Sequence, residues 1–188
     1  MKTIQNKLMH TKTLLILLFL AVTPLINFAQ SSIFEKYEDF DEVTNVVVTK
    51  HAFKLLSKVS SDTKEGKEYK QMVSNLDNLT VYTTENTKIA TQMQNDVKKY
   101  LKNTKLSELV RVKDKDANVK IYVREGNDEN HVSEFFMYIN NLNKSIKGNK
   151  PEAIIVSLTG NIDLNKIGEL ANKMNIPGGK HLQNVSKK

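Results

Sequence analysis

The sequence predicts one α+β domain, a two-layer sandwich in which a mostly antiparallel sheet of five or six strands carries helices on one face. The predicted order of elements is β-α-β-α-β-β-β-β-α, with helices at both ends of the domain. In the middle, four strand-like stretches follow one another with no helix between them, which is typical of an antiparallel sheet. A parallel sheet would need strands and helices to alternate throughout, and this chain lacks that pattern.

The first 29 residues are expected to be a cleavable secretory signal. Three lysines precede an apolar run at 14–26, and that run is shorter than the roughly 20 residues that cross a bilayer. Cleavage is expected after Ala29, with an uncleaved anchor as the alternative. This leaves a single domain over 30–176 and a basic tail over 177–188 that we expect to be disordered. The protein is therefore expected to be exported, to the periplasm or beyond the cell.

Composition excludes several classes of site. The chain has no cysteine, so it has no disulfide, no thiolate metal site and no lipid anchor of the kind that requires a cysteine after the cleavage site. Loss of the three lysines of the signal would lower the formal net charge from +7 to +4. Such a mild charge on an exported protein does not predict a nucleic-acid partner, and no membrane span is expected after cleavage.

The first half of the domain is expected to alternate strand and helix. A short helix over 67–75 and a strand over 79–84 precede the longest helix, over 86–103, which has an apolar face opposite several lysines. Before them, residues 44–49 (TNVVVT) are rich in β-branched side chains, which is typical of a buried strand. The helix directly after that strand should bury Ala52, Leu55, Leu56 and Val59.

Strands make up most of the second half. Residues 107–113 and 119–124 alternate apolar and polar side chains and predict a hairpin. A strand over 132–140 comes next, and the run AIIVSL at 153–158 is apolar on both faces, as a central strand would be. Asp163 should then cap a final helix that ends before the Ile-Pro-Gly sequence.

The predicted core draws on the strands and on one face of each helix. Truncating one of its large side chains to alanine should cost about 2 to 5 kcal/mol of folding free energy. The residues expected to be most buried are Val46, Val48, Leu56, Val97, Ile121, Val123, Ile155, Val156, Leu158 and Ile167.

Four segments, at 34–43, 46–56, 109–114 and 155–164, are similar to a known family. The most specific piece is the stretch L-T-G-N-I-D-L that begins at Leu158 and combines a turn with a helix cap. Through these segments, which span nearly the whole domain, the chain resembles the exported Bacteroidota family catalogued as domain of unknown function 4252. The resemblance implies an envelope or secreted protein, and it implies no activity, cofactor or catalytic residue.

The sequence has none of the common catalytic motifs. It contains no nucleophile elbow, no HExxH, no phosphate-binding glycine loop and no dinucleotide fingerprint. His51 and His131, the two histidines within the domain, are far apart in sequence and do not form the cluster that a zinc site needs. We expect them to be ordinary, partly exposed histidines, and we expect no cofactor and no metal.

An acidic segment at 35–42 is the next candidate site. Its carboxylates lack the spacing of a calcium-binding loop. Aromatic residues at every third position interleave with them, which favours an amphipathic turn that docks on the core. The docking side chains are expected to be Phe34, Tyr37 and Phe40.

One set of residues predicts a binding surface. If the valines and isoleucine of the hairpin face the helices, alternation turns its basic and aromatic residues to the opposite, open face. Such a face suits an anionic or aromatic partner, through guanidinium hydrogen bonds and ring stacking. The alternative is that long cationic side chains only keep an exposed sheet soluble. The candidate residues are Arg111, Lys113, Lys120, Tyr122, Arg124 and Tyr82.

Two functions remain open at this point. The first is a non-enzymatic envelope module that binds a protein, a peptide or an anionic partner through the open face. The second is an extracytoplasmic hydrolase whose Asp, Glu or His site matches no familiar motif. An enzyme should show a concave pocket with converging carboxylates or histidines, whereas a binding module should show a flat or grooved basic sheet face.

Overall fold

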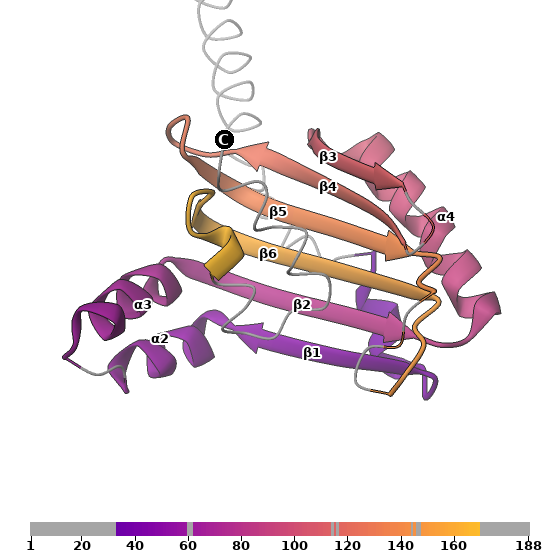
Figure 1. Cartoon of the computed structure of the whole chain (residues 1–188), viewed down its shortest axis with the longest axis horizontal. Helices are drawn as coiled ribbons and strands as arrows, with labels where there is room; N and C mark the ends of the chain where they lie inside the picture. The colour runs from indigo at the N-terminus through magenta and orange to yellow at the C-terminus, as the bar shows by residue number, and fades with distance from the viewer. Residues whose placement is uncertain are drawn as a thin grey trace, which may run out of the picture. The chain divides into compact units, whose positions relative to one another are not determined.

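The six strands of the described residues form one antiparallel sheet in the order β1-β2-β6-β5-β4-β3 (Figure 1). The computed structural model describes residues 33–59, 62–113, 115, 117–143, 145 and 148–169. The predicted α+β fold with an antiparallel sheet is confirmed. The helices, predicted on one face of the sheet, pack on both faces, as described below. In chain order the elements are η1 (Glu35–Asp39), β1 (Val43–Thr49), α2 (Lys50–Lys58), α3 (Lys64–Ser74), β2 (Leu76–Thr84), α4 (Thr87–Asn103), β3 (Ser107–Lys113), β4 (Asn118–Glu125), β5 (His131–Asn140) and β6 (Ala153–Asp163).

Strand β6 is the last of the described strands along the chain but lies in the middle of the sheet, between β2 and β5. Its residues Ile154, Ile155 and Val156 have no exposed surface, because both faces of the strand are covered. This confirms the prediction that 153–158 is a central strand. The two edges of the sheet are β1 and β3.

One face of the sheet, which we call the α2–α3 face, has a core to which both of these helices contribute. Phe53 of α2 and Val73 of α3 pack there in one cluster with Ile121 of β4 and Met137 of β5, and all four have no exposed surface. Both helices lie beyond one end of β1 and β2 in Figure 1. The apolar half of the β3–β4 hairpin points to this face, as predicted.

The opposite face, which we call the α4 face, has a core of its own. Met93 of α4 and Phe34, next to η1, pack there against Tyr82 of β2 and Phe136 of β5, and each is at most 2% exposed. Phe34 and Tyr37 confirm the prediction that the acidic N-terminal segment docks on the core through its aromatic side chains. The sheet therefore has a packed core on each side.

Most of the predicted core is buried, and Val46 is the exception. Its side chain is 49% exposed because β1 is an edge strand, and the covering helix α2 packs near Val48 at the end of that strand. Val48 and Leu56 are half-buried. The predicted core residues that are buried are Val97, Ile121, Val123, Ile155, Val156, Leu158 and Ile167.

The orientation of α2 also differs from the prediction. Phe53 is fully buried, whereas Leu55 and Val59 are 51% and 81% exposed. Buried Phe53 and Ser57 and half-buried Leu56 keep helical spacing, but the helix is rotated so that its aromatic ring enters the core. Helix α3 begins earlier than predicted, at Lys64, where the Thr63 side chain accepts a hydrogen bond from the Gly66 N–H at 3.1 Å.

Gly160 fixes the contact between β6 and the start of β2. Its φ is +135°, and a Cβ added there would lie 2.4 Å from the Asn75 carbonyl oxygen. The next residue, Asn161, donates its N–H to that same oxygen at 2.8 Å. Only glycine lets the two backbones approach this closely where the β2–β6 register shifts.

Several predictions lie outside the described residues. These are the secretory signal over 1–29, the basic tail over 177–188 and the last part of the final helix. Asp163 Oδ1 accepts the Asn165 N–H at 2.9 Å in the turn after β6, and the helical residues begin at Ile167, which is 2% exposed. Within the part of the chain that the structure describes, no helix is both long and apolar enough to cross a bilayer.

Candidate functional site

The strand pairing places the six candidate binding residues on the α4 face. In the β3–β4 ladder Arg111 lies opposite Lys120, and Glu108 lies opposite Tyr122. Residues at every second position share a face, so Lys113 and Arg124 point the same way. The predicted alternation is therefore present in the structure.

The prediction that this face is open is wrong over its middle. Tyr82 is 2% exposed, and its hydroxyl donates a hydrogen bond to Glu38 Oε1 of η1 at 3.0 Å. Burial, followed by that hydrogen bond, raises the pKa of Tyr82 above its ordinary range. Tyr122 is half-buried against the same cluster. Both tyrosines belong to the core that α4 and η1 complete, so neither offers a ring for a partner to stack on.

Helix η1 is held on the α4 face by a buried carboxylate of α4. Asp96 accepts the Tyr37 hydroxyl at 2.6 Å and lies 2.5 Å from Lys36 Nζ. Burial by itself would raise the pKa of Asp96, but its bonds to Lys36 and Tyr37 and the nearby charge of Lys99 outweigh burial and lower that pKa. The ionised carboxylate is thus the stable form, and it ties η1 to α4.

A second buried carboxylate engages Arg124. Glu134 is 6% exposed and accepts two hydrogen bonds from the Arg124 guanidinium, at 2.9 and 3.2 Å. The Tyr100 hydroxyl of α4 donates to the other oxygen of Glu134. Burial, and after it the bond to Glu134, raises the pKa of Tyr100. Arg124 therefore serves the packing of α4 on the sheet, and two of its guanidinium N–H groups are already bound to Glu134.

The remaining candidates are exposed and lie toward the β3 edge. Arg111 is exposed and forms an ion pair with Glu108 at 2.5 Å. That pairing, more than any other contact, lowers the pKa of Glu108. Lys120 is half-buried, whereas Lys113 is exposed at the end of β3. Of the six predicted residues, Lys113 is the one that lines an open concavity of ligand size.

This concavity, which we call the lysine basin, lies where the β3–β4 turn meets the segment after β5. Its volume is about 410 Å³, within the usual range of ligand sites. Among the described residues, no carboxylate forms an ion pair with any of its three lysines. The lining residues are Lys113, Lys115, Asn118, Asn141, Leu142, Asn143, Lys150 and Glu152.

Two backbone features shape the basin. Asn143 donates its side-chain N–H to the Lys115 carbonyl, which joins the two connections that form the walls. Asn141 has a φ of +55°, a left-handed conformation that asparagine tolerates and that turns the chain directly after β5. The sequence reasoning missed Lys115 and Lys150 because it treated both connections as loops. The sequence signal was uneven, because residues 141–150 are rich in lysine and asparagine whereas the β3–β4 turn carries one lysine between two aspartates.

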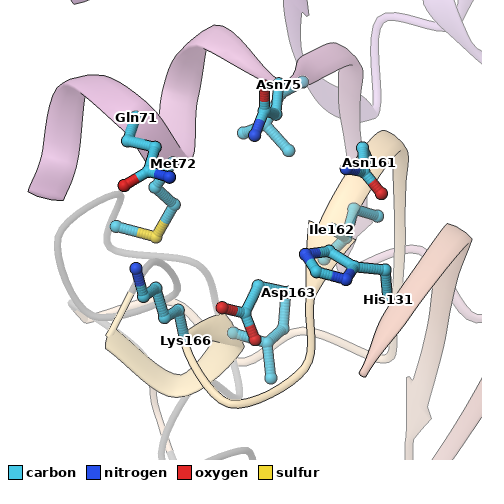
Figure 2. A pocket seen from close by; sticks show the side chains of 10 residues that line it. Gln71, Met72, Asn75, His131, Asn161, Ile162, Asp163 and Lys166 are labelled. Atoms are coloured by element: carbon cyan, nitrogen blue, oxygen red, sulfur yellow. The ribbon is translucent and has the colours of Figure 1, made fainter. Parts of the chain in front are cut away.

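A smaller cavity lies beside His131, between the end of α3 and the ends of β5 and β6 (Figure 2). His131 Nδ1 lies 2.8 Å from Asp128 Oδ1, and this contact is the main cause that lowers the pKa of Asp128. Asp163 and Lys166 stand around the same opening in Figure 2. Its volume is about 50 Å³, enough for a few water molecules and far below the size of a substrate pocket.

The described residues contain no group of three or more potential metal ligands. His51 lies exposed on α2, away from the His131 cavity. The Asp128–His131 pair involves one imidazole and one carboxylate, which is fewer ligands than a structural or catalytic zinc ion takes from protein.

Comparison with known proteins shows the family of this chain. No curated protein and no solved structure matches the chain. A family model described as "Domain of unknown function (DUF4252)" matches residues 37–170, from the buried Tyr37 to just beyond the last described residue. That match includes all six strands, both sheet faces and the lysine basin. The chain therefore belongs to the family described as Domain of unknown function (DUF4252).

Proposed function

We propose that this protein is a non-enzymatic, exported binding module that holds an anionic group of its partner in the lysine basin. The observation that carries the proposal is the composition of the basin. Lys113, Lys115 and Lys150 surround a concavity of about 410 Å³ together with three asparagine side chains. Ammonium and amide N–H groups are donors that bind carboxylate, sulfate or phosphate oxygens.

Glu152 also lines the basin and limits what it binds. Its carboxylate offsets one of the three positive charges and repels an anion placed next to it. A compact anionic group on a larger partner fits this arrangement better than a polyanion that would need an uninterrupted basic surface. Export rests on the N-terminal sequence, where lysines precede a short apolar run.

The alternative function, an extracytoplasmic hydrolase, would use the cavity at His131. The Asp128 carboxylate orients the His131 imidazole through Nδ1, an arrangement that histidine general bases also use. The cavity of about 50 Å³ has room for water but none for a substrate beside it. We therefore favour the binding module.

The proposal is tested by adding inorganic phosphate and measuring the NMR chemical shifts of the backbone amides during the titration. Shifts should concentrate at 113–118 and 141–152, and replacing Lys113, Lys115 and Lys150 together with Gln should abolish them. The control replaces three exposed lysines of α4 and α2, Lys98, Lys102 and Lys54, with Gln, which removes the same charge. If phosphate changes the amide chemical shifts equally in both variants, it acts by general screening of surface charge, and this result would contradict a binding site in the basin.

A further inference from the structure

Strand β1 is an edge strand without a charged side chain. It pairs with β2 along all seven residues, and its other side has no partner among the described strands. Val46 and Val47 are 49% and 43% exposed. Bare apolar edges of this kind readily pair with another strand, and proteins usually protect them with charges, prolines or bulges.

Backbone direction shows which groups point outward from β1. Thr84 of β2 accepts the Glu152 N–H with its carbonyl, so its peptide groups face β6. Val43, opposite Thr84, donates its N–H to Phe40 and not to β2. Because direction alternates along an antiparallel ladder, Asn45 and Val47 also turn their N–H and C=O groups toward the free edge.

The sequence of β1 is complementary to itself. Residues 46–48 are three valines, so this run reads the same in both directions about its centre, Val47. An antiparallel pair with its two-fold axis at Val47 sets Val46 of one copy opposite Val48 of the other. Val46 and Val48 lie opposite Val81 and Leu79 of β2 and so share the α2–α3 face. In this register the α2–α3 face of one copy therefore continues into the α2–α3 face of the other.

Charges at the two ends of β1 also favour a second copy. Asp41 and Glu42 precede the strand, Lys50 and Lys54 follow it, and all four are exposed. Lys50 also forms an exposed ion pair with Asp77 within the same chain. In an antiparallel pair the acidic start of each β1 lies beside the basic end of the other. A partner of this chain's own sequence thus supplies both the apolar strand and the matching charges.

We propose that the protein forms a two-fold dimer in which the β1 strands of two copies pair antiparallel about Val47. The two sheets then join into one continuous sheet, and Val46 and Val47 of each copy become covered. This interface involves the edge opposite β3 and does not depend on the lysine basin or on the proposed function.

Sedimentation of protein purified from cells that express the whole chain tests the dimer. The wild type should reach dimer mass as concentration rises, and added salt should weaken association. Val47→Lys places two like charges opposite each other and should shift the dissociation constant upward by roughly tenfold or more. Val59→Lys, the same change at the more exposed residue that directly follows α2, should leave it unchanged. A monomeric wild type, or a dimer that Val47→Lys leaves intact, would overturn the proposal.

Disulfide trapping tests the register, since the chain has no cysteine of its own. Facing residues such as Val46 and Val48 of the partner should have Cα atoms about 4.5 Å apart, within disulfide range. A mixture of Val46→Cys and Val48→Cys chains should therefore form the mixed disulfide dimer. Either variant alone should form a disulfide slowly, because residue 46 of one copy lies two positions along the strand from residue 46 of the other, and the same holds for residue 48. Equal trapping in all three samples would contradict this register.

Discussion

The two faces of the sheet are both buried, but by different chemistry. The α2–α3 face is filled with aliphatic side chains and phenylalanine. The α4 face holds tyrosines and two buried carboxylates, Asp96 and Glu134, whose oxygens accept hydrogen bonds from tyrosine hydroxyls of other elements. Each polar group in that core has a partner, so burial does not leave it unsatisfied.

This difference shows why alternation of polar and apolar residues in a strand does not by itself predict that the polar face is exposed to solvent. Tyr82 and Arg124 occupy strand positions at which polar residues would normally face solvent. Their polar ends reach Glu38 and Glu134, while the ring and the aliphatic stem pack against apolar neighbours. A face with polar residues can therefore be a core when the partners come from elements distant in sequence.

The largest expected effect comes from neighbouring residues of β5 that point to opposite faces. Phe136 lies on the α4 face and Met137 on the α2–α3 face, and both have no exposed surface. We expect Phe136→Ala to cost about 3 to 5 kcal/mol and Met137→Ala about 2 to 5 kcal/mol in chemical unfolding. A cost below about 1 kcal/mol for Phe136→Ala would mean that the α4 face is open in solution.

A smaller effect should separate two arginines of the same face. Arg124→Ala leaves buried Glu134 without its guanidinium and should cost about 1 to 3 kcal/mol in thermal or chemical unfolding. Arg111→Ala removes only an exposed pair with Glu108 and should cause no measurable loss. If the two variants are equally stable, the bond between Arg124 and Glu134 does not contribute to the core.

The smallest effect should appear in the pH dependence. The pKa of Asp96 is lower in the folded chain than its ordinary value of 3.8, so its stabilisation is present above that pH and is lost as pH falls below it. Asp96→Asn keeps an acceptor for Tyr37 and loses the charge. The free energy of unfolding of the variant should therefore be lower than that of the wild type at neutral pH, and the difference should shrink in acid. A difference that stays constant down to pH 2 would contradict the role of the ionised carboxylate.

Local pattern was sufficient for most of the fold. Alternation placed the hairpin residues on their faces, and the apolar run at 153–158 identified the central strand. The exposure of Val46 could not be read from the sequence, because a β-branched run looks the same on an edge as in the middle of a sheet. The rotation of α2 could not be predicted either. The face with Leu55 and Val59 and the face with Phe53 both have the spacing of an apolar helix face, so periodicity does not choose between them.

The candidate site was less predictable than the fold. The sequence pointed to Lys113, but its neighbours in the basin, Lys115 and Lys150, come from two connections that meet only after β3, β4 and β5 have paired. The roles of Tyr82 and Arg124 were missed because their partners, Glu38 and Glu134, belong to other elements. Long-range partners of this kind leave no local periodicity.

The central position of β6 also determines when folding can finish. Before residue 153 is synthesised, β1 and β2 can pair with each other, and β3, β4 and β5 can do the same, but nothing joins these two groups. In that state β2 and β5 each present an unpaired apolar edge. A polypeptide cut short ahead of β6 is thus two half-sheets prone to aggregate, and β6, the last of the described strands to be synthesised, is the one that unites them.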